Sequence, residues 1–145
     1  MPQIRTVIFD LDDTLLETGE LFSEVLGNLC ARIRERLGPT APPPLEIIRR
    51  QEEIDIKLLA GQGVTPQRFA ESMVETYREF LAGNPAARAE DEAYLRNEGL
   101  RAFSDIPELT PDIFAVFDAL GDREKIIYTW GAPEIQLPRI KAHEL

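Results

Sequence analysis

Three carboxylates fall within four residues near the start of the chain, at Asp10, Asp12 and Asp13. They directly follow the apolar stretch 4–9, so we expect them at the carboxyl end of a buried strand, the edge where open α/β sheets bind ligands. A divalent cation would offset their repulsion, and Mg²⁺ prefers carboxylate and carbonyl oxygens. A carboxylate can also attack phosphorus to form an aspartyl phosphate. A second carboxylate two residues on can then protonate a leaving alkoxide and activate water.

The pattern of apolar residues predicts the elements that position these groups. Residues 4–9 and 125–129 are nearly continuous apolar stretches, typical of parallel strands buried on both faces. Between them, apolar residues recur at helical spacing over four segments, 21–37, 45–59, 66–81 and 86–98. Thr65-Pro66 and Thr110-Pro111 are helix start signals, the second for a helix that Gly121 ends, and a last short helix follows residue 133. The order predicts an α/β fold with a large helical insert.

The sequence DLDDT at residues 10–14, after a hydrophobic strand, resembles the first motif of the haloacid dehalogenase superfamily of phosphohydrolases, Asp-x-Asp-x-Thr. The resemblance implies that Asp10 is the phosphate-accepting nucleophile and a metal ligand. It implies that Asp12 is the general acid and base, with its backbone carbonyl on a bound Mg²⁺. Thr14 would brace the loop, and Asp13 occupies a variable, non-catalytic position.

The second motif of this superfamily, a hydrophobic strand that ends in Thr or Ser, is matched by residues 126–129. Many relatives continue Thr-Asn-Gly with a Gln five residues later, and this chain has Gln136, with Trp130 in place of the Asn. The resemblance implies that Thr129 hydrogen-bonds the phosphoryl oxygens, assisted by backbone amides near Trp130 and Gly131. The helical middle of the chain matches the position of the family's helical cap.

The resemblance therefore implies a Rossmann-like parallel sheet, incomplete in this chain, with residues 1–16 and 101–145 as core and 17–100 as cap. The family's third motif, a Lys, and its fourth, an acidic pair, have no counterpart after Thr129. Arg139 and Lys141 are the only later cations, and we expect both to be solvated on the last helix. We expect the chain to be either a fragment or a degenerate member, with the sheet edge beyond residues 125–129 exposed, or covered by a second copy or a further C-terminal segment.

Three functions remain open on the sequence. The first is a Mg²⁺-dependent phosphomonoesterase that acts on a small phosphorylated metabolite. The second is a 2-haloacid dehalogenase, which shares the nucleophile but generally lacks the second Asp, so Asp12 favours phosphoryl transfer. The third is a non-catalytic or truncated relative. A receiver domain is disfavoured, because it has no long helical insert after its first strand.

Composition excludes several other classes of protein. The 145 residues include 16 Lys and Arg and 26 Asp and Glu, a formal net charge of −10, so we expect no broad binding to nucleic acid or to anionic membranes. A single cysteine excludes an internal disulfide framework. With no signal peptide and no long apolar run, we expect a cytoplasmic protein.

Overall fold

The computed structural model describes residues 4–145, which divide into two compact units. The α/β unit consists of Met1–Leu21, described from residue 4, and Ile106–Leu145. The helical unit consists of Phe22–Asp105. The chain thus leaves the α/β unit after its first strand and loop, builds the helical unit, and returns.

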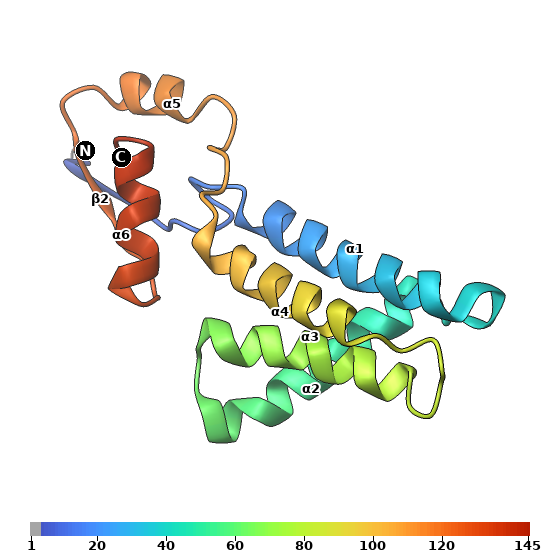
Figure 1. The fold of residues 1–145 in the computed structure, drawn as a ribbon. Coiled ribbons are helices and arrows are strands. Elements are labelled where there is room, and N and C mark those ends of the chain that lie inside the picture. Colours follow the sequence, from blue (N-terminus) through green and yellow to red (C-terminus); the bar gives the residue numbers. More distant parts are fainter. Residues whose placement is uncertain (1–3) are drawn as a thin grey trace. The chain divides into compact units, whose positions relative to one another are not determined.

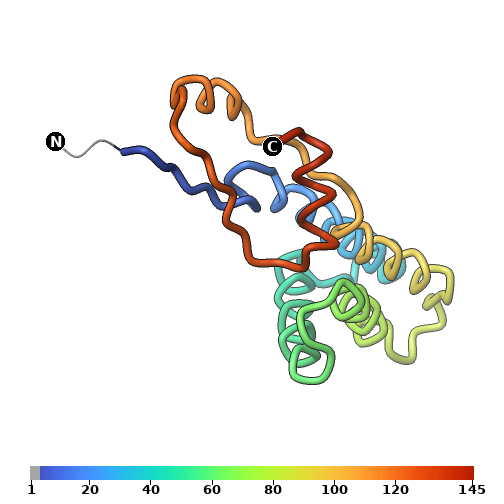
Figure 2. The backbone as a smooth tube through the Cα atoms, turned by 90° about the vertical axis from the view of Figure 1, so that its left-hand side faces the viewer, coloured from blue at the N-terminus to red at the C-terminus, as the bar shows by residue number. Residues whose placement is uncertain are grey.

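The α/β unit contains a parallel pair of strands, β1 (Thr6–Phe9) and β2 (Glu124–Ile127). Ile8 pairs with Ile126 and Phe9 with Ile127, and the two strands run side by side in Figures 1 and 2. The parallel pairing and the α/β class are as the sequence predicts. Because parallel strands run the same way, the chain leaves both strands at one edge of the sheet.

Two helices complete this unit, α5 (Ile113–Leu120) and α6 (Pro133–Ala142) (Figure 1). Its buried core consists of Leu11, Leu15 and Leu16 of the loop after β1 and Ile113 of α5. Partly buried residues from both strands, both helices and two loop positions pack against it: Phe9, Leu109, Phe117, Ile127, Ile140 and Leu145. The rings of Phe9 and Phe117 meet edge to face, with centroids 5.3 Å apart. The leucines of the loop after β1 therefore form the centre of this core.

The prediction that both strands are buried on both faces is wrong for the described residues. Phe9 and Ile127 pack against the core cluster, whereas Ile8 is 65% exposed and Ile126 is 39% exposed. Adjacent residues of a strand point to opposite faces, and within residues 4–145 the core cluster covers only one of them. The two strands therefore carry more apolar side chains than the described part of the chain buries.

The predicted start of α5 at Thr110-Pro111 is also wrong. The helix begins at Ile113, after Asp112 in a left-handed conformation with φ of 63°. The Thr110 amide instead donates a hydrogen bond of 2.9 Å to the carbonyl oxygen of Leu15. Thr110 thus ties the returning chain to the loop after β1, while Gly121 ends α5 as predicted.

Four helices build the helical unit or lead into it: α1 (Thr18–Leu37), α2 (Pro44–Gln62), α3 (Pro66–Phe80) and α4 (Ala89–Ser104). A short 3-10 turn, Gly38–Thr40, follows α1. All four were expected near these positions, and the Thr65 cap is confirmed, because its hydroxyl accepts from the Arg68 amide at 3.2 Å. Apolar side chains from each helix form one core cluster, which includes Phe69, Met73 and Tyr77.

Helices α3 and α4 pack closely where α4 carries Gly99 (Figure 1). A Cβ atom at Gly99 would lie 2.5 Å from the Cα of Ala70, so only glycine permits this approach. No helix among residues 4–145 is long and apolar enough to cross a membrane.

Candidate functional site: the loop after the first strand and helix α6

Asp10 lies immediately after β1, at the edge where β2 also ends. The Tyr128 amide donates a hydrogen bond of 2.8 Å to the Phe9 carbonyl oxygen, so the two strand segments remain paired up to this point. The Asp10 side chain is exposed, and within residues 4–145 its carboxylate forms no hydrogen bond or ion pair. A carboxylate without protein donors retains its lone pairs for a metal ion or an electrophile.

Asp12 lies two residues further and is held far more tightly than Asp10. Its Oδ1 accepts hydrogen bonds from the Thr18 hydroxyl at 2.8 Å and from Nη1 of Arg139 at 3.1 Å. Its Oδ2 accepts from Nε2 of Gln136 at 2.7 Å. The side chain is 32% exposed, so the carboxylate is engaged by three donors yet remains open to solvent on one side.

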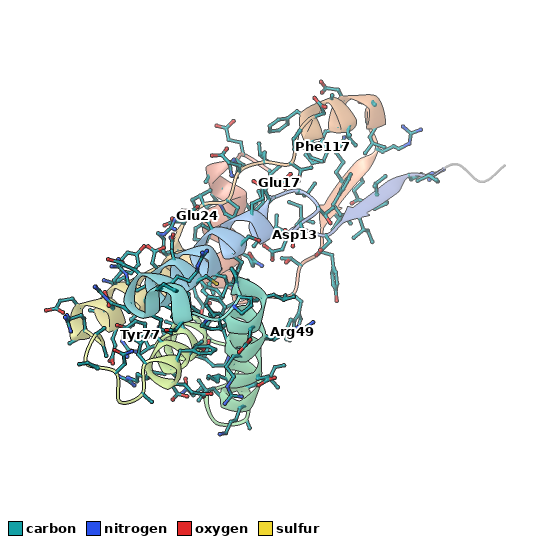
Figure 3. The ribbon with its side chains drawn as sticks, turned by 90° about the vertical axis from the view of Figure 1, so that its right-hand side faces the viewer. Asp13, Glu17, Glu24, Arg49, Tyr77 and Phe117 are labelled. Atoms are coloured by element: carbon teal, nitrogen blue, oxygen red, sulfur yellow. The ribbon has the colours of Figure 1, made fainter. Side chains whose placement is uncertain are left out.

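The loop that carries these carboxylates is shaped by its own backbone. The Leu11 carbonyl oxygen accepts from the amides of Leu15 and Leu16 at 2.9 and 3.1 Å, and all three leucines are fully buried. Asp13 adopts a left-handed conformation with φ of 57°, and its Oδ1 accepts from the Gly19 amide at the start of α1. Figure 3 shows Asp13 on this loop. Asp13 therefore has a structural partner.

Thr14 is exposed on the same loop. Its amide makes a long contact of 3.4 Å with the Leu11 carbonyl oxygen, while its hydroxyl forms no hydrogen bond within the described part of the chain. The side-chain brace to Asp12 that the structure does show comes from Thr18, which sequence reasoning did not single out.

Thr129, Trp130 and Gly131 follow β2 and were the predicted phosphate-binding group. The Thr129 hydroxyl oxygen lies 3.3 Å from Nε2 of Gln136, the same nitrogen that donates to Asp12. A Cβ atom at Gly131 would lie 2.8 Å from that nitrogen. Trp130 is 83% exposed. The structure thus brings Thr129 and Gly131 to Asp12 through Gln136, and leaves the indole of Trp130 in solvent.

The expectation that Arg139 is solvated is wrong. The residue was expected to be solvated, but it is 3% exposed and forms an ion pair with Asp12. Gln136 and Arg139 are three positions apart on α6, and residues with this spacing share a helix face. That spacing was a usable signal, although it does not by itself indicate which face is buried. Lys141 is exposed as expected.

The donor set at the strand end fits a hard cation such as Mg²⁺. The Asp10 carboxylate has no protein partner within residues 4–145, and in the same range the Asp12 carbonyl oxygen accepts no hydrogen bond. Both are oxygen donors, and Mg²⁺ is commonly held by one or two carboxylates while it keeps several waters. No group of three or more His, Cys, Asp or Glu residues that could hold a metal ion occurs in the described part of the chain.

The arrangement combines Asp10, a carboxylate without a partner among the described residues, with the oriented carboxylate of Asp12 and the hydroxyl of Thr129, both of which contact Gln136. One solved structure, a haloacid dehalogenase-like family hydrolase from Xanthomonas campestris, matches 95% of this chain with a TM-score of 0.75 at 19% identity. The chain has a haloacid dehalogenase-like fold. It spans 55% of the length of that hydrolase. The predicted fold resemblance is therefore confirmed.

Other haloacid dehalogenase-like structures match more loosely. An L-2-haloacid dehalogenase from Xanthobacter autotrophicus matches with a TM-score of 0.45 at 20% identity, over 99% of this chain and 53% of its own. A further dehalogenase matches with a TM-score of 0.46 at 19% identity, over 98% of this chain and 58% of its own. No protein-family model matches the sequence, and no curated protein matches it significantly.

Proposed function

We propose that the protein is a hydrolase that transfers the phosphoryl group of a small phosphorylated metabolite to Asp10 and then to water. The observation that carries this proposal is the contrast between Asp10 and Asp12. Asp10 is exposed and without partners in the described chain, whereas three side-chain donors orient Asp12 two residues away. A nucleophile needs free lone pairs, and a proton carrier needs a defined position.

In the first half of the reaction, a carboxylate oxygen of Asp10 attacks phosphorus and the bond to the leaving alkoxide breaks. Protonated Asp12 gives its proton to that alkoxide as the bond breaks. In the second half, Asp12 accepts a proton from water as the water oxygen attacks the aspartyl phosphate, which regenerates the Asp10 carboxylate. Thr129 donates its hydroxyl hydrogen to a phosphoryl oxygen, where negative charge needs stabilisation.

Mg²⁺, when bound by the Asp10 carboxylate and the Asp12 carbonyl oxygen, would neutralise phosphate charge near the nucleophile. The remaining ligands would be waters and substrate oxygens, as is usual for this ion. Asp10 keeps its carboxylate free for this role, because it forms no ion pair with any residue in the range 4–145.

A haloacid dehalogenase activity is the second candidate, since an exposed carboxylate can equally displace halide from carbon. The role of Asp12 distinguishes the dehalogenase activity from phosphoryl transfer. A halide leaving group needs no proton, whereas an alkoxide leaving group does. The elaborate support of Asp12 by Thr18, Gln136 and Arg139 therefore favours phosphoryl transfer.

The test is hydrolysis of p-nitrophenyl phosphate, with and without Mg²⁺, by the protein and two variants. Asp10→Asn removes the attacking carboxylate, and we expect turnover to fall to background. Asp13→Asn is the matched control, because its side-chain oxygen can still accept from the Gly19 amide, and we expect its turnover to be retained. Release of halide from a 2-haloalkanoic acid, without phosphate release, would instead favour the dehalogenase. Equal turnover by wild type and Asp10→Asn would remove Asp10 from the nucleophile role.

A further inference from the structure

Helix α6 buries two polar side chains, Gln136 and Arg139, and exposes the apolar Leu137 between them. Gln136 is 6% exposed and Arg139 is 3% exposed, whereas Leu137 between them is 50% exposed. An ordinary surface helix places its apolar residues inward. Burial of an arginine also carries a desolvation penalty that an apolar residue of similar size avoids. Stability of the fold alone therefore does not account for these two residues on the inner face.

The side-chain amide nitrogen of Gln136 contacts two residues of the candidate site, Asp12 and Thr129. Nε2 donates to Oδ2 of Asp12 at 2.7 Å and lies 3.3 Å from the Thr129 hydroxyl oxygen. Its Oε1 is buried and has no hydrogen-bond partner among the described residues. A buried acceptor without a partner costs free energy and calls for an explanation. The amide is therefore oriented so that its nitrogen contacts Asp12 and Thr129, although this leaves its own oxygen without a partner among the described residues.

Arg139 completes the hold on Asp12 from one turn further along α6. Its Nη1 donates to Oδ1 at 3.1 Å, so the two carboxylate oxygens are engaged from the same helix by different residues. Rotation about either side-chain torsion of Asp12 would break at least one of these contacts. Proton transfer requires a donor within about 2.6–3.2 Å of the acceptor, so a fixed orientation bears directly on the proposed reaction.

We propose that Gln136 and Arg139 are positioning residues, which hold the Asp12 carboxylate in one orientation beside Thr129. Their effect on turnover rests on the proposed function, whereas their effect on Asp12 itself does not. Gln136 aligns the proton carrier at the end of β1 with the phosphoryl-binding hydroxyl at the end of β2. Arg139 restrains the opposite oxygen through one guanidinium nitrogen, Nη1.

Turnover of p-nitrophenyl phosphate with Mg²⁺ tests the consequence for catalysis. Gln136→Leu removes both amide contacts, and Arg139→Lys keeps the charge but moves the donor to a shorter, differently shaped side chain. We expect kcat to fall about 10- to 100-fold in Gln136→Leu, in line with small misplacements of catalytic groups, and less in Arg139→Lys. KM is expected to stay within about twofold, because the proposed role of both side chains is to orient Asp12 and not to bind the substrate. Lys141→Met, on the exposed face of α6, is the control and should behave as wild type.

The background of Asp12→Ala separates positioning from general support of the fold. If Gln136 acts through Asp12, Gln136→Leu has no further effect on kcat once Asp12 is removed. A purely structural role would lower the urea unfolding midpoint by the same amount in both backgrounds. An equal fold-loss of kcat from Gln136→Leu in the two backgrounds, or an equal lowering of the midpoint in both, would overturn the proposal. Wild-type kcat in both Gln136→Leu and Arg139→Lys would overturn it as well.

Trp130 supplies a readout that needs no activity. It is the only tryptophan of the chain, and it lies between Thr129 and Gly131, both of which adjoin Gln136. We expect its fluorescence anisotropy to fall in Gln136→Leu and in Asp12→Ala, and to fall no further in the double variant. If wild type hydrolyses no phosphoester, the proposed function fails, and the anisotropy and urea measurements alone decide the positioning role. Anisotropy unchanged in Gln136→Leu would then overturn it.

Discussion

The hydroxyl of Tyr77 donates a hydrogen bond of 2.7 Å to Oδ2 of Asp91, and both side chains are buried in the helical unit. Arg36 donates to both oxygens of the same carboxylate, at 2.6 and 2.9 Å. The three residues belong to α3, α4 and α1, and Figure 3 shows Tyr77 among these helices. One buried carboxylate thus ties three helices together.

Tyr77→Phe tests the contribution of this hydroxyl. The change removes the hydrogen bond to Asp91 and also the acceptor of the Arg88 amide, which lies 3.1 Å from the hydroxyl oxygen. We expect a loss of about 1–3 kcal/mol in the free energy of unfolding, because a buried partner is left unsatisfied. Tyr94→Phe is the control, expected within about 0.5 kcal/mol of wild type, because the described chain offers its hydroxyl no hydrogen bond. Equal losses in urea denaturation of the two variants would contradict the prediction.

Asp91 also predicts how stability depends on pH. Hydrogen bonds from Arg36 are the main reason that the pKa of Asp91 lies below its ordinary value, with Tyr77 adding to them and burial opposing them. The folded state therefore binds fewer protons than the unfolded state below about pH 4, the ordinary range of an aspartate. The stabilisation is complete at neutral pH and is lost as the pH falls through the lowered pKa.

Comparison of Asp91→Asn with wild type measures the pH-dependent contribution of the Asp91 charge to stability. The difference in unfolding free energy between wild type and Asp91→Asn should be largest at pH 7 and should shrink toward pH 3. Urea titrations at several pH values measure it. A difference that stays constant over this range would show that the charge of Asp91 does not stabilise the fold.

Gly99→Ala is expected to destabilise the helical unit. Its Cβ would lie 2.5 Å from the Cα of Ala70 and 2.9 Å from its Cβ, so α3 and α4 must separate. Overpacking of this kind costs about 1–3 kcal/mol. Gly27→Ala in α1 is the matched control, because a Cβ there meets nothing within 4 Å. We expect that control to gain roughly 0.5–1 kcal/mol from helix propensity, and thermal unfolding of both variants measures the contrast. Similar shifts of the same sign would contradict the close approach.

Gly131→Ala tests the packing between the turn after β2 and Gln136. The new Cβ would lie 2.8 Å from Nε2 and 3.0 Å from Cγ of Gln136, so the amide must move away from Asp12 and Thr129. We expect a loss of p-nitrophenyl phosphate turnover of about tenfold or more, as for other displaced catalytic groups. In a Gln136→Ala background the clash disappears, and Gly131→Ala should then have no further effect. A loss that persists in that background would assign the effect to the turn itself.

Local sequence determined much of this protein. The Asp10–Thr14 motif after an apolar stretch indicated a strand that ends in a polar loop at the sheet edge. Helical spacing in four central segments predicted α1 to α4, and Thr65 with Pro66 predicted the start of α3. These signals succeed because capping and amphipathic patterns act between residues a few positions apart.

Only the tertiary structure decided which groups surround Asp12. Arg139 lies 127 positions away in the chain and Gln136 lies 124 away. The motif after the second strand pointed to Gln136, but nothing local distinguishes Arg139 from the exposed Lys141 on the same helix. Which face of α6 turns inward depends on the packing of Ile140 against the leucines of the loop after β1. The apolar residues of β1 and β2 were equally ambiguous, because composition shows that a strand can be buried but not which of its faces is covered. The support of Asp12 is thus a consequence of long-range packing, which sequence patterns over a few residues do not record.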